Sequence, residues 1–251
     1  MDIEIQKVGW TAAGQRLTAA AGSVVGNHYR ENYDVLHLDP GRAFAVVADG
    51  MGSGPGSAAA GRTAVDVFTR SAPAAADPDG LRQAVNLAQK DVRNAGQTLD
   101  ELTGCTLVAF VADAGSSAWI VQIGDSRAYR LRDGLVELLT VDHTIAWLGL
   151  LHGWFAADSE EAKAARYRLT RYVGHPADPE PDILNVTLQP GDVYLLCSDG
   201  VADQLSYERI IQLLGTNPDP AAAAHFILED TLEAGGADNA TAVVIKVEQT
   251  I

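Results

Sequence analysis

Residues 118–131 read AWIVQIGDSRAYRL, and this stretch decides the class of the fold. An apolar run at 118–123 is followed by a short polar turn and then by a second strand-like run at 128–131. Two strands joined by so short a turn form a hairpin and can only be antiparallel. A doubly wound parallel sheet would need a helix between them, so the predicted class is α+β.

Further strand-like and helical segments lie on both sides of this hairpin. Strands are predicted at 43–48, 106–111, 193–197 and 241–247. Helices are predicted at 57–70, 81–99 and 220–232, where apolar residues recur at helical spacing. The strand pattern lapses from Asp142 to Leu184, and we interpret this segment as a mostly helical insertion. The pattern as a whole predicts antiparallel sheets covered by helices.

Length and composition favour one folded domain, which we assign to residues 1–251. Hydrophobic residues make up 47% of the chain, and no Pro- or Gly-rich stretch is long enough to separate two domains. Acidic residues exceed basic ones by 33 to 18, and the net charge of −15 argues against nucleic acid and membrane partners. The N-terminus does not resemble a signal peptide, and Cys105 and Cys197 suit buried thiols, so we expect a cytoplasmic protein.

Four aspartates share one local context, the junction between an apolar strand and a turn. They are Asp49, Asp125, Asp199 and Asp238. A carboxylate at such a junction points out of the core on a rigid stem, and a neighbouring glycine lets a ligand approach closely. Carboxylate and carbonyl oxygens suit Mg²⁺ and Mn²⁺, whereas no Cys-x-x-Cys or His-x-x-x-His spacing indicates zinc. The pattern therefore predicts an oxygen-rich site for a divalent cation.

The ordered set of motifs resembles the metal-dependent serine/threonine phosphatases of the protein phosphatase 2C (PPM) family in its bacterial form. The matching runs are VVADGMGSG, GCTLVAFV, IGDSRAYRLRDG, LTVDHT, GDVYLLCSDGVADQLS and GGADNATAVVI. They extend over most of the chain in family order. The resemblance implies a four-layer αββα sandwich of two antiparallel sheets flanked by helices. It also implies a two-metal site at one edge and an adjacent flap, which would be residues 142–184.

The same resemblance implies roles for individual residues. Asp49 would bridge two ions, and Gly50 would offer its backbone carbonyl. Asp199 and Asp238 would complete the ligands of the first ion. Asp34 would belong to the metal site by ordering metal-bound water, and Asp125 and Asp203 would match the acidic positions of a third and weaker ion.

The implied activity is hydrolysis of phosphoserine and phosphothreonine in proteins. Two ions of Mn²⁺ or Mg²⁺ would clamp the phosphate and activate a bridging hydroxide for in-line attack on phosphorus. The implied partners are phosphorylated proteins, together with a serine/threonine kinase or its targets, and we expect a monomer.

The sequence departs from the family pattern near its start. The family shows an arginine, two spacers and then Asn-Glu-Asp. Aligning Asn32 and Asp34 to this motif places Tyr33 at the glutamate and Tyr29 at the arginine that grips the substrate phosphate. Arg30 lies one residue away, so we regard it as a candidate phosphate contact, with a solvated surface arginine as the alternative.

Three alternatives stay open at this stage. The general acid is a metal-bound water, His28 or His143. The glycine-rich run after the first predicted strand matches a loose dinucleotide-binding spacing at Gly54, Gly56 and Ala59, although hairpins follow it where a βαβ unit needs a parallel strand. The disturbed N-terminal motif also suits a catalytically weak or inactive regulatory module with the same fold.

Overall fold

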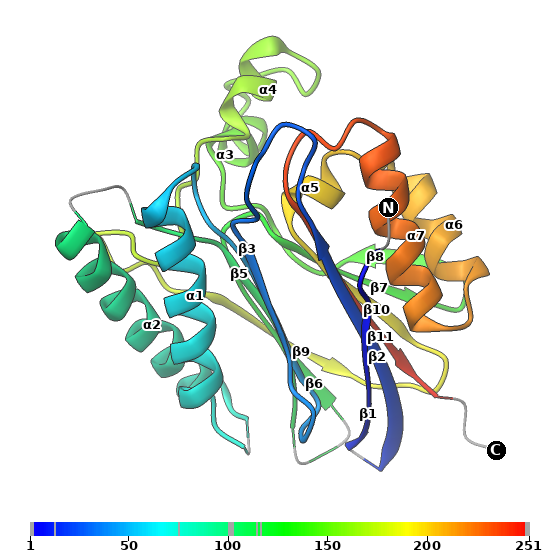
Figure 1. Ribbon diagram of the computed structural model, residues 1–251. Coiled ribbons are helices and arrows are strands. Elements are labelled where there is room, and N and C mark those ends of the chain that lie inside the picture. The colour runs from blue at the N-terminus through cyan, green and yellow to red at the C-terminus, as the bar shows by residue number, and fades with distance from the viewer. Residues whose placement is uncertain are drawn as a thin grey trace.

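Two antiparallel β-sheets packed face to face form the centre of the molecule (Figure 1). The computed structural model describes residues 3–12, 14–74, 76–99, 103–113, 115 and 117–248. The larger sheet has the strand order β1 (Gln6–Ala12), β2 (Gln15–Val24), β11 (Ala240–Val247), β10 (Val193–Cys197), β7 (Arg127–Arg132) and β8 (Leu135–Leu138). The smaller sheet has the order β3 (Asp34–Leu38), β4 (Phe44–Asp49), β5 (Leu107–Ala112), β6 (Ser117–Ile123) and β9 (Asp182–Thr187).

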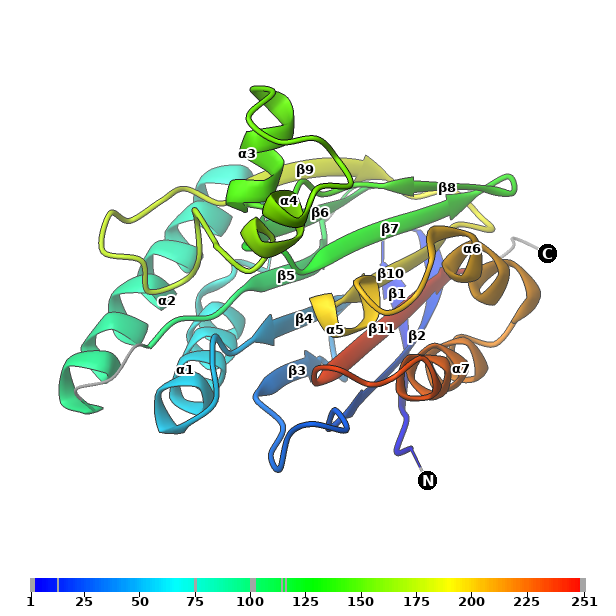
Figure 2. The same cartoon turned by 90° about the horizontal axis from the view of Figure 1, so that it is seen from above.

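Helices cover the outer face of each sheet and complete four layers, as the two views show (Figures 1 and 2). The smaller sheet is covered by α1 (Pro55–Ser71) and α2 (Pro78–Leu99). The larger sheet is covered by α5 (Asp199–Ala202), α6 (Tyr207–Thr216) and α7 (Pro220–Glu233). The predicted αββα sandwich is therefore confirmed, as are the three predicted long helices.

Strand β4 shows why the chain reads as a continuous apolar run where it enters the core. Phe44, Val46 and Ala48 pack against α1 and α2, whereas Ala45 and Val47 face the other sheet. Successive side chains of a strand point to opposite faces, and here both faces are buried, so no polar alternation survives. The first solvent-accessible position is Asp49, at the strand's end.

The segment 142–184 is not mostly helical, so that prediction is wrong. Its helices are α3 (Ile145–Leu151) and α4 (Glu160–Ala165), and β9 begins at Asp182 within the predicted segment. Prolines at 176, 179 and 181 prevent a third helix, because proline lacks the N–H that a helix interior needs. Both short helices lie at one end of the sandwich (Figure 1). We call residues 142–184 the flap.

The dinucleotide-binding alternative is also wrong for this chain. Helix α1 does follow β4 through the glycine-rich turn, but β4 pairs antiparallel with both of its neighbours, β3 and β5. The parallel strands that a dinucleotide-binding βαβ unit requires are absent from the described sheets.

Candidate active site

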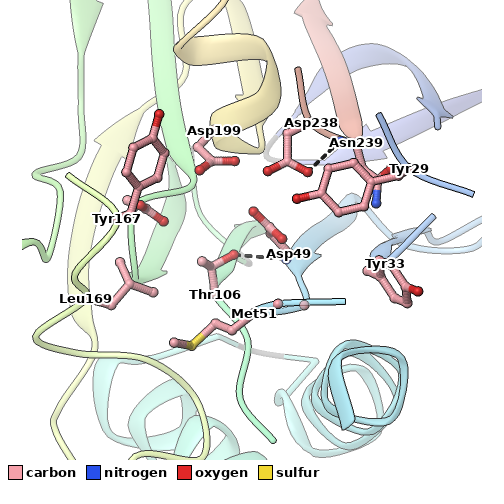
Figure 3. Close-up of a pocket in the computed structure, with 13 residues that line it drawn as sticks. Tyr29, Tyr33, Asp49, Met51, Thr106, Tyr167, Leu169, Asp199, Asp238 and Asn239 are labelled. Atoms are coloured by element: carbon pink, nitrogen blue, oxygen red, sulfur yellow. Dashed lines mark hydrogen bonds between the residues drawn. The ribbon is translucent and has the colours of Figure 1, made fainter. Parts of the chain in front are cut away.

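Four carboxylates from different parts of the chain surround a pocket of about 340 Å³ at the flap end of the sandwich (Figure 3). Asp49 ends β4, and Asp125 lies in the turn between β6 and β7. Asp199 begins α5 directly after β10, and Asp238 lies just before β11. The structure thus brings together the four strand-end aspartates that the sequence singled out, and Gly50 lies beside them in the pocket wall.

The remaining wall of the pocket is neutral. Its residues are Tyr29, Tyr33, Met51, Gly52, Thr106, Tyr167, Leu169 and Asn239. The flap supplies Tyr167 and Leu169, so it forms one side of the pocket (Figure 3). Sequence reasoning missed Thr106, Asn239 and both flap residues as lining residues. Asn239 had a signal, its place directly after Asp238, but the flap residues had none.

Hydrogen bonds fix the backbone that carries Asp49. Its N–H donates to the Thr106 hydroxyl at 3.0 Å, and that hydroxyl is 2.6 Å from the hydroxyl of Ser126. The next residue, Gly50, crosses helix α1 so closely that a Cβ atom there would lie 2.5 Å from the Ser57 carbonyl oxygen. Only glycine fits at this crossing. Gly50 also lines the pocket, so its main chain is exposed to a ligand there.

Asp34 lies behind Asp49 and does not line the pocket. The two residues are paired across β3 and β4. Asp34 Oδ2 accepts hydrogen bonds of 2.7 Å from the hydroxyls of Ser198 and Thr241, while Oδ1 is buried with no hydrogen-bond partner. Ser198 directly precedes Asp199, and Thr241 lies near the start of β11, three residues after Asp238, so Asp34 links the three strand ends.

Burial and mutual repulsion make these carboxyls unusually reluctant to ionise. Burial raises the pKa of Asp199 to about 7, with the charge of Asp238 adding to the effect. Burial likewise raises the pKa of Asp34 to about 6 despite its two hydroxyl donors. The pKa values of Asp49 and Asp125 are raised well above their ordinary range by burial and by the charge of Asp199. None of the described residues that line this pocket is a Lys, Arg or His that could offset the repulsion.

A divalent cation fits the chemistry of this donor set. Asp199 Oδ1 is buried with no hydrogen-bond partner, and the pocket offers carboxylate oxygens, which hard cations prefer. Among the described residues, however, no three His, Cys, Asp or Glu side chains are gathered tightly enough to hold an ion as they stand. The carboxylates instead stand around an open space, and a cation there would offset the repulsion that raises their pKa values.

The raised pKa values predict that the metal-free protein loses stability as pH rises. An unfolded aspartate titrates near 3.8, whereas folded Asp34 and Asp199 titrate near 6 and 7. Between these values the folded state binds more protons than the unfolded state, so its stabilisation is complete below about pH 4 and lost as pH rises through 7. Urea unfolding in a chelator at pH 5, 6, 7 and 8 measures this.

Asp199→Asn is the matched test of that pH dependence. The variant removes one buried charge, so its free energy of unfolding should fall less between pH 5 and pH 8 than that of the wild type. A metal-free wild type that became more stable over this range would contradict the electrostatic account.

Asp203 lies beside the main pocket in an adjoining hollow. It shares that hollow with Asp125 and Asp199, which suits the predicted pairing of Asp125 and Asp203 at one place. Its carboxylate is 2.8 Å from Arg166 of the flap and 3.8 Å from Arg127. A third cation at this position would have to displace the Arg166 guanidinium.

Arg30 and the two candidate histidines do not reach the pocket. Arg30 and His28 are exposed, and neither is among the residues that line the pocket. His143 is buried: its Nδ1 accepts a hydrogen bond from the N–H of Gly124, and its Nε2 lies 3.1 Å from Asp182. Burial lowers the pKa of His143. A neutral, fully engaged imidazole of this kind positions the turn before Asp125 and is not placed to protonate a leaving group.

The sequence model of one family, described as protein phosphatase 2C, matches residues 28–233. The serine/threonine protein phosphatase PstP of Mycobacterium tuberculosis is 38% identical over 145 residues, which are 57% of this chain and 27% of the relative. The chain thus spans about a quarter of the length of that curated relative.

Two solved structures share the fold over nearly the whole chain. The catalytic domain of the serine/threonine protein phosphatase PstP in complex with two manganese ions has a TM-score of 0.81 and 31% identity, and the match covers 93% of this chain and 99% of that one. PppA, described as a key regulatory component of T6SS in Pseudomonas aeruginosa, has a TM-score of 0.81 and 30% identity, covering 92% of this chain and 97% of the other.

Proposed function

This chain belongs to the protein phosphatase 2C family, and on that premise we propose that it is a metal-dependent protein serine/threonine phosphatase. The observation that carries the proposal is the convergence of Asp49, Asp125, Asp199 and Asp238 on one open pocket. The family is metal-dependent, and a similar catalytic domain holds two manganese ions. The substrates would be proteins that carry phosphoserine or phosphothreonine.

Under this proposal, the residues of the site have distinct roles in binding the cations and positioning the ligands. Asp49 and the Gly50 carbonyl would hold the cation pair, with Asp199 and Asp238 completing the first ion. When bound, two Mn²⁺ or Mg²⁺ ions supply a clamp for the phosphate and lower the pKa of a water molecule for in-line attack. Thr106 holds Asp49 in place through its backbone. Asp34 would act from behind Asp49, by orienting it or an ordered water.

The adjoining hollow would serve a third ion. Asp125 and Asp203 would be its ligands, and Arg166 pairs with Asp203. Because Arg166 belongs to the flap, binding of an ion in this hollow would also break the ion pair between Arg166 and Asp203 that holds the flap in place.

The test is an assay of the purified protein with an aryl phosphate and a phosphothreonine peptide. We expect turnover with Mn²⁺ or Mg²⁺, and none in excess chelator or with zinc alone, because the carboxylates need hard cations to bind a phosphate. Full activity in excess chelator would contradict the proposal.

A regulatory module without catalysis is the second candidate, favoured by one observation: none of the described residues that line the pocket is a Lys, Arg or His that could bind a phosphate. The same assay separates the two candidates. A regulatory module would bind Mn²⁺, measured by calorimetry, without turnover of either substrate at any metal concentration.

Phosphorylated proteins that are targets of a serine/threonine kinase would be the partners, and a monomer in the cytoplasm would be the acting form. Burial of both free thiols, Cys105 and Cys197, supports a reducing compartment. No helix in the described ranges is long and apolar enough to cross a bilayer.

A further inference from the structure

The pocket that would receive a doubly negative phosphate contains four carboxylates and, among its described lining residues, no Lys, Arg or His. The two guanidinium groups of the adjoining hollow, those of Arg127 and Arg166, are already paired with carboxylates. Arg166 lies 2.8 Å from Asp203, and Arg127 lies 2.6 Å from Asp142. A phosphoryl oxygen that points away from the cations therefore needs a neutral hydrogen-bond donor from the pocket wall.

The side chains of two neutral polar residues in the wall already form hydrogen bonds within the protein. The Thr106 hydroxyl accepts from the Asp49 N–H and lies 2.6 Å from Ser126 Oγ. Asn239 donates from Nδ2 to the Glu31 carbonyl and accepts at Oδ1 from the N–H of Gly26. Neither side chain can turn toward a ligand without breaking hydrogen bonds that hold the segments carrying the aspartates.

Three tyrosines remain, and they point in different directions (Figure 3). The hydroxyl of Tyr33 points away from the carboxylates, and the ring of Tyr167, a residue that is 76% exposed, carries its hydroxyl outward. The hydroxyl of Tyr29 points at the carboxylate cluster, within hydrogen-bonding reach of Asp238. The Tyr29 ring packs edge-on against Tyr33, with ring centroids 6.3 Å apart, and this contact supports its orientation.

We propose that the Tyr29 hydroxyl donates a hydrogen bond to a phosphoryl oxygen of the substrate. The proposal rests on the proposed phosphatase function and adds a substrate-binding residue to it. Asp238 is the present neighbour of the hydroxyl, and it is also a proposed metal ligand. Once its charge is directed at a cation, the hydroxyl is left at the pocket with its proton available, and a phosphate is the strongest acceptor that would enter there.

Tyr29→Phe tests the proposal, with Tyr33→Phe as the matched control. Each variant removes one hydroxyl from the same wall and keeps both rings in contact. At saturating Mn²⁺, we expect Tyr29→Phe to raise KM for a phosphothreonine peptide about tenfold, the effect of losing one hydrogen bond to a charged group. Tyr33→Phe should change KM by less than about twofold.

Calorimetric titration of inorganic phosphate into the Mn²⁺-loaded protein gives a readout besides turnover. Tyr29→Phe should weaken phosphate binding by a factor similar to its rise in KM, with the Mn²⁺ concentration for half-maximal activity unchanged. If Tyr29 only positions Asp238, the variant will instead need more Mn²⁺ and lose kcat while phosphate affinity stays the same, and the proposal is overturned. Equal behaviour of the two variants overturns it as well.

The outcomes also separate this inference from the proposed function. A wild type that binds phosphate through Tyr29 but turns over no substrate refutes the phosphatase and keeps the inference. An active wild type whose phosphate affinity is indifferent to Tyr29→Phe refutes the inference and keeps the phosphatase.

Discussion

Replacing Asp49 with asparagine is expected to lower metal-dependent turnover by at least about a thousandfold, or about 4 kcal/mol of transition-state stabilisation. Asp49 is the carboxylate proposed to hold both cations, and an amide oxygen is a far weaker ligand for a hard cation. The fold should survive, because Asp49 lies at the end of β4 and its backbone N–H keeps its bond to Thr106. Turnover of a phosphothreonine peptide at saturating Mn²⁺ measures the loss.

Asp66→Asn is a suitable control for this loss, since Asp66 is an exposed helix residue whose carboxylate pairs with Arg70. Its turnover should match the wild type. In the absence of metal, Asp49→Asn should also unfold at a higher temperature than the wild type at pH 8, because burial and neighbouring charges oppose ionisation of the native carboxyl. Near-normal turnover of Asp49→Asn would show that the site lies elsewhere.

Gly200→Ala is expected to damage the protein without removing a single functional group. A Cβ atom at position 200 would lie 2.0 Å from the carbonyl oxygen of Asn239, so either α5 or the loop before β11 must move. These two segments carry Asp199 and Asp238. Overpacking of this kind costs about 1–3 kcal/mol of stability, and a displacement of about 1 Å at reacting groups costs about a hundredfold in rate.

Gly215→Ala provides the matched control, because Gly215 lies in α6 with no atom near the position of an added Cβ. Alanine there should leave turnover unchanged and add up to about 1 kcal/mol of stability through its higher helix propensity. Thermal unfolding and peptide turnover of both variants decide the matter. A Gly200→Ala protein with wild-type stability and rate would mean that the crossing of the two segments relaxes at no cost.

Strands buried on both faces were the easiest elements to predict. Strand β10 is an example, since its residues alternate between the core under α6 and α7 and the core between the sheets, leaving an unbroken apolar run. Strand β2 was missed because it reads QRLTAAAGSV, and alanine and glycine are depleted in strands. Tertiary packing explains its composition, since an added Cβ at Gly22 would lie 2.8 Å from Leu228 Cδ1 of α7.

The residues of the candidate site were predictable where a carboxylate lies at the end of an apolar strand. Asp49 and Asp199 follow apolar runs directly, so the sequence locates them on rigid stems. Irregular segments give no such information. Arg30 and Tyr29 are adjacent in a loop, and only the three-dimensional path of that loop turns Tyr29 into the pocket and Arg30 to solvent.

None of the described residues that line the pocket is a Lys, Arg or His, and this has a consequence for the cell. A phosphorylated side chain carries close to two negative charges at neutral pH, and without bound cations the pocket would present carboxylates within a chain of net charge −15. The metal-free protein would therefore repel its proposed substrates. In the proposed phosphatase, depletion of Mn²⁺ or Mg²⁺ would stop turnover and leave phosphorylated proteins free for other binding partners. A pocket lined by arginines would instead keep them bound.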